Sequence, residues 1–298
     1  MRIPRPLSSV ECVWSAGALL GEGPVWSGSS RSLFWVDILG RKLHRYSLET
    51  HSGDSWSFDE EITCATERRS GNGLLVTLRN TIAFFQPETG AINELANPEN
   101  DRPGNRFNDG KCDSRGRLWA GTMDFACREP TGALYRFDQE RRCERMLDGI
   151  TITNGPTWSL DEKTMFFTDT FKNQIYAFDF DAASGSLDRQ REWKRFDVDV
   201  DGSPDGMTTD ADGRIWIAHW GAACVTCHTP SGEMLTKISL PTRFVTSCAF
   251  GGDDLQTLFI TTASNDLTPQ QKVQEPLAGG LFSVQLDVRG LPAHQFAG

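Results

Sequence analysis

Residues 113–122 read DSRGRLWAGT, a turn rich in Asp, Gly and Arg followed by a short apolar run. The same profile returns at residues 210–220 as DADGRIWIAHW. A Gly-containing turn that leads into alternating or fully apolar residues predicts a hairpin that enters a β-strand. Four more runs share this profile, and the first apolar residues of the six runs are Leu33, Leu74, Leu118, Met165, Ile215 and Leu258.

The spacing of these runs predicts the fold. Successive runs are separated by 41, 44, 47, 50 and 43 residues, close to the period of about 40 to 50 residues of a four-stranded propeller blade. Each run is followed by a second pair of strands, which in the sixth repeat covers residues 279–296. Residues 10–19, VECVWSAGAL, are expected to supply a strand that closes the ring and protects its edge. We therefore predict an all-β chain in which residues 1–298 form a single domain, a six-bladed β-propeller with four antiparallel strands per blade.

Composition narrows the class of partner. The chain has a formal net charge of −10 and no basic run that could follow a phosphate backbone, so nucleic acid is not an expected partner. The N-terminus has no apolar stretch of signal-peptide length, and no run approaches about 18 apolar residues. We expect a soluble cytoplasmic protein without a membrane partner, monomeric or weakly dimeric.

The eight cysteines are scattered along the chain, which does not suit a disulfide scaffold. Cys224 and Cys227 have the spacing of half a zinc site or of a redox motif, but no second such pair follows. Their odd offset puts them on opposite faces of a strand. Buried free thiols are the expected state of most cysteines.

The repeat frame identifies a ring of polar residues. Innermost strands of a propeller line its central channel, so equivalent positions in the repeats converge there. Counting back 10 or 11 residues from each first apolar residue reaches a polar residue every time. The six are Glu22, Thr63, Asn108, Asn154, Asp205 and Ser247.

A turn at the start of a strand explains any one of these residues, because Asn154 and Asp205 each precede glycine and Asn-Gly is a common turn pair. Two carboxylates and two carboxamides in register favour a site instead. They offer only oxygen ligands, which suit hard divalent cations such as Ca²⁺, Mg²⁺ or Mn²⁺. We interpret these four residues as a metal site in the channel.

Four segments carry a resemblance to a known family: GEGPVW at 21–26, NRFNDGKCDSRGRLWAGTMD at 105–124, ITNGPTWS at 152–159 and GSPDGMTTDADGRIWIA at 202–218. Together they resemble the family of SMP-30 (regucalcin) and the bacterial gluconolactonases, and the similarity extends to AGGLF at 278–282. The resemblance implies a six-bladed propeller with one catalytic divalent metal in the channel.

The resemblance also implies individual roles. Glu22, Asn154 and Asp205 match the metal ligands, and Asn108 matches a further ligand or a substrate contact. Arg106 corresponds to the substrate-binding arginine. Asp124 lies near the position of an acidic residue that contacts sugar hydroxyls in the family, so we expect it to bind substrate as well.

A function follows from these roles. We expect hydrolysis of a sugar lactone to its sugar acid, with the metal as Lewis acid and Asp205 as candidate general base. Calcium is the first expectation for the metal, with Zn²⁺, Mn²⁺ and Mg²⁺ as alternatives. Hydrolysis of an organophosphate by the same logic and a metal-binding propeller without turnover are the alternative functions. The loops at 125–131 and 264–279 are candidate lids.

Other acidic and nucleophilic residues receive structural interpretations. Asp113, Asp210 and Asp212 lie in hairpin turns. Asp37 and Asp169 end strands and are expected to cap neighbouring loops. No G-x-S-x-G motif is present, so Ser247 is not expected to act as a nucleophile.

Overall fold

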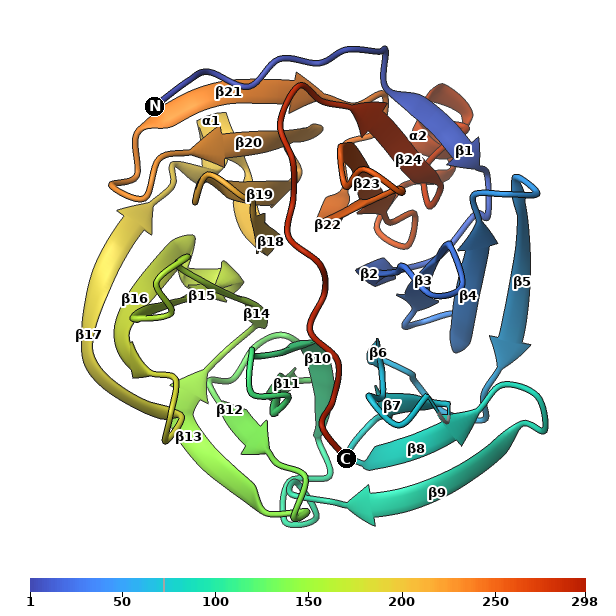
Figure 1. Cartoon of the computed structure of the whole chain (residues 1–298). Helices are drawn as coiled ribbons and strands as arrows, with labels where there is room; N and C mark the ends of the chain where they lie inside the picture. The colour runs from blue at the N-terminus through green and yellow to red at the C-terminus, as the bar shows by residue number, and fades with distance from the viewer. Residues whose placement is uncertain (72) are drawn as a thin grey trace.

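The computed structural model describes residues 1–71 and 73–298, and in this part of the chain six four-stranded antiparallel sheets are arranged in a ring (Figure 1). The predicted six-bladed β-propeller is confirmed. The innermost strands of the first five sheets are β2 (Gly21–Ser27), β6 (Cys64–Glu67), β10 (Asn105–Cys112), β14 (Thr153–Trp158) and β18 (Ser203–Thr209), and the sixth begins with β22 (Val245–Gly251).

The remaining strands lie outward in each sheet in chain order. The first three sheets continue with β3 (Ser32–Asp37), β4 (Lys42–Ser47), β5 (Ser52–Ser57), β7 (Leu74–Thr77), β8 (Ile82–Gln86), β9 (Ala91–Ala96), β11 (Leu118–Asp124), β12 (Gly132–Phe137) and β13 (Cys143–Ile150). The last three continue with β15 (Thr164–Asp169), β16 (Gln174–Asp181), β17 (Ser186–Arg195), β19 (Ile215–Trp220), β20 (Cys224–His228), β21 (Met234–Ser239), β23 (Thr257–Thr262) and β24 (Leu281–Gln285).

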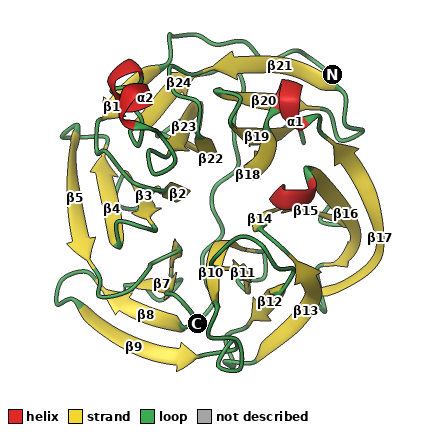
Figure 2. Cartoon of the chain, turned by 180° about the vertical axis from the view of Figure 1, so that it is seen from behind, coloured by secondary structure: helices red, strands yellow, loops and turns green. Residues whose placement is uncertain are grey.

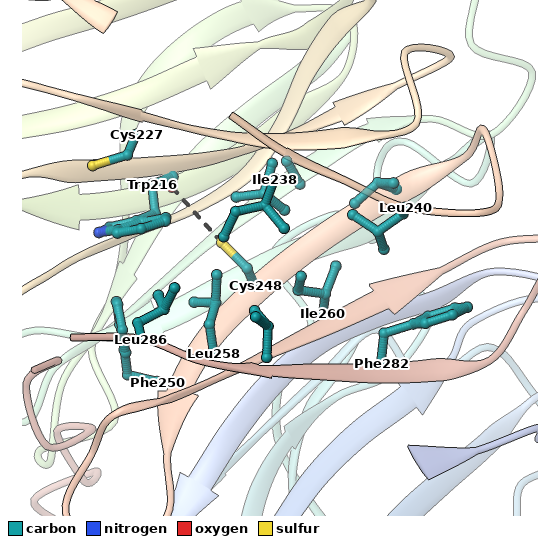
Figure 3. Close-up of a cluster of buried hydrophobic side chains, with 14 of the residues drawn as sticks. Trp216, Cys227, Ile238, Leu240, Cys248, Phe250, Leu258, Ile260, Phe282 and Leu286 are labelled. Atoms are coloured by element: carbon teal, nitrogen blue, oxygen red, sulfur yellow. Dashed lines mark hydrogen bonds between the residues drawn. The ribbon is translucent and has the colours of Figure 1, made fainter. Parts of the chain in front are cut away.

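The second strand of each sheet carries the apolar run that marks the repeat. All six residues of β3 are buried, whereas most residues of the outer strand β5 are exposed. An inner strand is covered on both faces by the neighbouring sheets, so it requires apolar residues without alternation. Figure 3 shows one such core, in which Trp216 of the fifth sheet belongs to the same buried cluster as Phe250 and Phe282 of the sixth. Burial between the sheets therefore accounts for the period of the apolar runs.

The cysteines described in the structure are free thiols, as expected. Cys227 and Cys248 belong to the core between the fifth and sixth sheets, and the Cys248 thiol donates to the carbonyl oxygen of Trp216 at 3.8 Å (Figure 3). Burial raises the pKa of Cys248 to about 12. These thiols serve as small apolar side chains.

The two chain ends depart from the simple repeat. The N-terminal strand β1 (Glu11–Trp14) pairs with β24 and is the outer strand of the sixth sheet. The prediction of a hairpin over residues 279–296 is wrong, because only β24 lies in that sheet. Since β1 already occupies the position beyond β24, the later residues have no sheet edge to join.

The C-terminal segment, residues 286–298, instead crosses the ring over the channel (Figure 1). Its backbone is anchored on both sides: Gly290 donates to the Leu255 carbonyl at 2.8 Å, and Ala297 donates to the Gly116 carbonyl at 2.9 Å. Phe296 is buried and stacks on Phe137 with ring centroids 5.7 Å apart. We call this side of the ring the C-terminal face.

Short helices lie on the opposite side, which we call the helix face (Figure 2). They are the 3₁₀ turn η1 (Thr170–Lys172), α1 (Val198–Asp201) and α2 (Pro269–Gln274). Thr268 caps α2 in a capping box with Gln271. No helix in the described part of the chain is long and apolar enough to cross a membrane.

A buried pair of histidines leads to a prediction about acid stability. His219 and His228 both contact the Thr226 hydroxyl, at 2.6 and 2.9 Å, and burial lowers the pKa of His228 to about 4. In the unfolded chain His228 binds a proton below about pH 6.5, whereas in the folded chain it does so only near pH 4. The contribution of the neutral His228 to stability is therefore lost as the pH falls from about 6.5 towards 4.

The variant His228→Gln removes this titration. Wild type loses stability between pH 7.5 and pH 5.5 through His228, and the variant does not. The difference in unfolding free energy between wild type and the less stable variant is therefore expected to be about 1 kcal/mol smaller at pH 5.5 than at pH 7.5. Urea denaturation of both proteins at the two pH values measures the difference. An unchanged difference would mean that His228 titrates alike in the folded and unfolded chains.

Candidate active site

The four predicted metal-site residues lie on four innermost strands, Glu22 on β2, Asn108 on β10, Asn154 on β14 and Asp205 on β18. We call these four the ring residues. All four are at most 5% exposed. Thr153, the residue before Asn154, pairs across the sheet with Asp169, and Asp169 directly precedes η1. The ring residues therefore lie towards the helix face.

The local backbone explains why these residues point into the channel. Each of the four strands has an irregularity in its pairing at the ring residue: between Glu22 and Val25, Phe107 and Gly110, Asn154 and Thr157, and Pro204 and Met207. A bulge bends the strand and re-aims a side chain. The glycines of the EGP, NDG, NGP and PDG motifs fall within these bulges. A Cβ on Gly206 would collide with the Ser247 hydroxyl, so glycine is required there.

Two carboxyls meet at the centre of the site. The side chains of Glu22 and Asp205 interact with each other, and Asp205 Oδ1 has no hydrogen-bond partner among the described residues. Burial, together with the charge of Asp109, raises the pKa of Glu22 to about 8. Burial and the charge of Glu22 raise the pKa of Asp205 well above its ordinary value. The ionised forms of both carboxyls are therefore disfavoured in this site unless a positive charge lies beside them.

Two carboxamides and an arginine form the adjoining wall. Arg106, 5% exposed, donates to Asn108 Oδ1 at 2.6 Å. Asn108 Nδ2 donates to Asn154 Oδ1 at 3.0 Å and to the Thr153 carbonyl at 2.7 Å. Among the described residues, the hydrogen bonds of the Asn108 side chain are made to Arg106, Thr153 and Asn154. The structure brings Arg106 and the two carboxamides together as one connected group.

Asp109 is a buried carboxylate that the repeat frame did not identify. Its Oδ1 accepts from Gly110 N at 2.7 Å and its Oδ2 from Gly155 N at 3.1 Å. Burial raises its pKa to about 6, with Lys111 acting in the opposite direction. The position after the ring residue is glycine on β2, β14 and β18, and Asp only here. This difference from the other three strands could have identified Asp109 from the sequence.

Asp124 is not joined to this group. Its carboxylate accepts backbone hydrogens from Ala126, Arg128 and Glu129, at 3.3, 2.9 and 3.1 Å. These bonds lower the pKa of Asp124 and hold the loop at 125–131. Phe125 beside it lies under the Arg106 guanidinium, 5.9 Å from the ring centroid. A substrate contact of Asp124 stays a prediction.

The other two polar positions of the repeat frame differ from the four. Thr63 shares a 2.6 Å hydrogen bond with Thr77 of its own sheet. Ser247 is buried and its hydroxyl has no partner. Neither supplies a charged ligand.

Most of the structural interpretations of other aspartates are confirmed. Asp113 and Asp210 hold their turns by accepting from Arg117 N and Arg214 N. Asp37 caps a loop through Leu19 N and Leu20 N, at 3.0 and 2.9 Å. The expectation for Asp169 is wrong: its carboxylate makes no capping hydrogen bond and instead lies 2.9 Å from the Lys172 ammonium.

The channel also contains a cavity of about 330 Å³ on the C-terminal face. Residues 291–294 of the C-terminal segment form one wall. The ends of the inner strands that lie nearer the C-terminal face form the others. Asp109 reaches this cavity, whereas the residues described as lining it include none of the four ring residues. The ring residues therefore lie on the helix-face side of Asp109.

The donor set fits a hard divalent cation. The part of the chain that the structure describes holds no group of three or more His, Cys, Asp or Glu side chains placed to bind a metal, but the ring residues combine two carboxylates with two carboxamides. The unpartnered Asp205 Oδ1 beside the Glu22 carboxyl is a ready oxygen ligand. Such oxygens suit calcium, magnesium and manganese.

Residues 20–264 match the family model described as the SMP-30/Gluconolactonase/LRE-like region. The chain belongs to this family. The match confirms the resemblance drawn from the sequence, and the matched span of the SMP-30/gluconolactonase model contains Arg106 and all four ring residues.

Relatives in the SMP-30/gluconolactonase family match over nearly their whole length. A Bacillus subtilis (strain 168) protein named "Putative sugar lactone lactonase YvrE" is 36% identical over 282 residues, 94% of this chain and 96% of the relative. Regucalcin of Gallus gallus is 33% identical over 296 residues, 97% of this chain and 98% of the relative.

Two solved structures of the family are similar throughout. A luciferin-regenerating enzyme has a TM-score of 0.92 at 29% identity and covers 99% of this chain and 100% of its own. Regucalcin from Agrobacterium tumefaciens, described as a calcium-binding protein, has a TM-score of 0.92 at 26% identity and covers 98% of each chain.

Proposed function

We propose that this chain hydrolyses a sugar lactone to the corresponding sugar acid with one divalent metal ion in the channel. The observation that carries the proposal is the pair of buried carboxyls, Glu22 and Asp205, which meet beside Arg106 and two carboxamides. Two ionised carboxylates repel each other in a low dielectric, and a bound cation relieves the repulsion. The names of the family and of the Bacillus relative support a lactone as substrate.

Glu22, Asn154 and Asp205 would hold the metal, with Asn108 as a further ligand or a substrate contact. Calcium is the first candidate because the donors are oxygens and the Agrobacterium relative is described as calcium-binding. Zn²⁺, Mn²⁺ and Mg²⁺ are the alternatives. When bound, the metal polarises the lactone carbonyl as a Lewis acid.

The residues of the chain supply the remaining steps. Arg106 donates hydrogen bonds to the substrate and holds it in register. Asp205 takes a proton from water as the water oxygen bonds to the carbonyl carbon. The ring C–O bond then breaks, and the departing oxygen takes up the proton to become a hydroxyl. One water is consumed for each lactone opened.

Asp124 is proposed as a further contact to sugar hydroxyls. Its carboxylate is engaged by three backbone amides of the loop at 125–131, so the contact requires this loop to rearrange when substrate binds. The loop borders Arg106 through Phe125. A movement there would change the wall of the site.

A panel of aldonolactones tests the proposal. Purified protein is mixed with glucono-, galactono-, arabino- and xylonolactone in turn, and acid release is followed with a pH indicator. The proposal predicts metal-dependent release for at least one lactone and loss of release in Asn154→Ala. If metal raises the melting temperature but no lactone opens, the protein is a metal-binding propeller or acts on another substrate such as an organophosphate.

Arg106→Lys tests the positioning of substrate. One guanidinium nitrogen of Arg106, Nη1, donates to both Asn108 Oδ1 and the Phe107 carbonyl, at 2.6 and 2.9 Å. Lys has a single nitrogen and lacks the further donors that the guanidinium can offer to a substrate. We expect kcat/KM to fall about 10- to 100-fold, the effect of losing a charged hydrogen bond of about 1.5 to 3 kcal/mol.

The matched control is Arg31→Lys, which alters an arginine paired with Asp253 at the surface. We expect its kcat/KM to stay within about twofold of wild type. Equal kcat/KM for Arg106→Lys and wild type would remove Arg106 from the substrate site.

A further inference from the structure

The Thr170 hydroxyl joins two of the ring residues' strands. Asn154 Nδ2 donates to Thr170 Oγ1 at 2.9 Å, and Thr170 Oγ1 donates to the Pro204 carbonyl at 2.8 Å. Asn154 belongs to the fourth sheet, and Pro204 directly precedes Asp205 in the fifth. Thr170 lies in η1 on the helix face and is only 9% exposed.

The direction of these hydrogen bonds determines how the Asn154 carboxamide is oriented. A hydroxyl has one hydrogen, and the Pro204 carbonyl can only accept. With its hydrogen committed to Pro204, Thr170 Oγ1 can only accept from Asn154. The amide nitrogen of Asn154 must then face Thr170, which turns Oδ1 to the opposite side, where it accepts from Asn108 Nδ2 at 3.0 Å.

The same hydroxyl fixes the strand that carries Asp205. The pairing of β18 with β19 is irregular between Pro204 and Met207, so Asp205 lies in a bulge that its own sheet holds less firmly. The Thr170 hydroxyl donates to the carbonyl of Pro204, the residue before Asp205, and so anchors Pro204 to the neighbouring sheet. One side chain thus controls the orientation of one candidate ligand and the backbone of another.

We propose that Thr170 is a positioning residue for the channel metal, which fixes the orientation of Asn154 Oδ1 and the backbone beside Asp205, two of the residues that would hold the ion. This inference rests on the proposed function, because it needs a metal at the ring residues. Groups that hydrogen-bond metal ligands set their orientation, and loss of such a group commonly weakens metal affinity about 10- to 100-fold.

A second hydroxyl pair provides a matched control. Thr157 and Thr209 share a buried 2.8 Å hydrogen bond between the same two strands, β14 and β18. Their hydroxyls contact neither Asn154 nor Pro204 in the described interactions. Thr157→Val therefore removes an equivalent bond between the sheets without loosening a candidate ligand.

The test is calcium binding by calorimetry on the full-length, chelator-stripped protein, with wild type, Thr170→Val, Thr170→Ser and Thr157→Val. Thr170→Val is expected to raise the Kd about 10- to 100-fold. Thr170→Ser keeps the hydroxyl and is expected to stay within a few-fold of wild type, as is Thr157→Val. Melting temperatures without metal confirm that each variant is folded.

The outcomes separate this inference from the proposed function. If wild type binds calcium and Thr170→Val binds it with the same Kd, Thr170 does not position the ligands. A Kd raised equally in Thr170→Ser or in Thr157→Val would also overturn the inference, because packing rather than the hydroxyl would then be responsible. If wild type binds none of calcium, manganese, magnesium and zinc, the metal site itself is wrong and the inference falls with it.

Discussion

Asp205→Asn is expected to lower kcat for lactone opening by about 10²- to 10⁴-fold, the usual contribution of a general base. Asn keeps the size of the side chain and one oxygen ligand but cannot take a proton from water. Asp205 is 5% exposed and its Oδ1 has no hydrogen-bond partner, so this oxygen is free to meet a water molecule in the channel. Turnover is measured at saturating metal, with metal content determined on the same sample.

Ser247→Ala is the control for Asp205→Asn. Ser247 holds the equivalent position in the sixth sheet, and its buried hydroxyl also has no partner. We expect its kcat to stay within a few-fold of wild type, since the hydroxyl has no described hydrogen-bond partner that could take its proton. Near-normal turnover of metal-loaded Asp205→Asn would show that another group accepts the proton.

Glu22→Gln is expected to weaken metal binding by at least about 100-fold, because it removes one of the two carboxylates that oppose the charge of the cation. The same change should raise the melting temperature of the metal-free protein at pH 9. Burial raises the pKa of Glu22 from about 4.5 to about 8, so the folded state loses stability as the pH rises between these two values, and the whole cost is present at pH 9. A neutral side chain avoids this cost.

The two effects of Glu22→Gln have opposite signs, which makes the prediction specific. Calorimetric titration gives the Kd, and thermal unfolding with and without calcium gives the stabilities. A Glu22 that served only to support the fold would lose stability on substitution and leave metal affinity unchanged. That pattern would contradict its assignment as a ligand.

Repetition made the fold predictable from the sequence. Each apolar run, such as the one that starts at Leu118, is buried between two neighbouring sheets, so the same physical demand recurs in every blade. The ring residues could be found by counting because each begins an inner strand at an equivalent bulge. Position in the repeat was therefore sufficient to bring Asn108 and Asn154 together.

Contacts that break the repeat could not be found in this way. The C-terminal segment resembles the second hairpin of a blade in composition, but β1 occupies the place of its last strand. Thr170 acts across two sheets, from a 3₁₀ turn that has no counterpart in the other described blades. Asp124 lies near the position where the family resemblance implies an acidic residue, yet its carboxylate accepts hydrogen bonds from backbone amides of the following loop, which the repeat does not predict.

The most direct test of the proposed metal-dependent lactonase activity is one titration of activity against bound metal. Protein stripped with a chelator receives calcium, manganese, magnesium or zinc in steps, and lactone opening and bound metal are measured in each sample. The account predicts no opening without metal, a rise that saturates at one ion per chain, and no response in Asn154→Ala. Full activity in the stripped protein, or activity in Asn154→Ala equal to wild type, would contradict it.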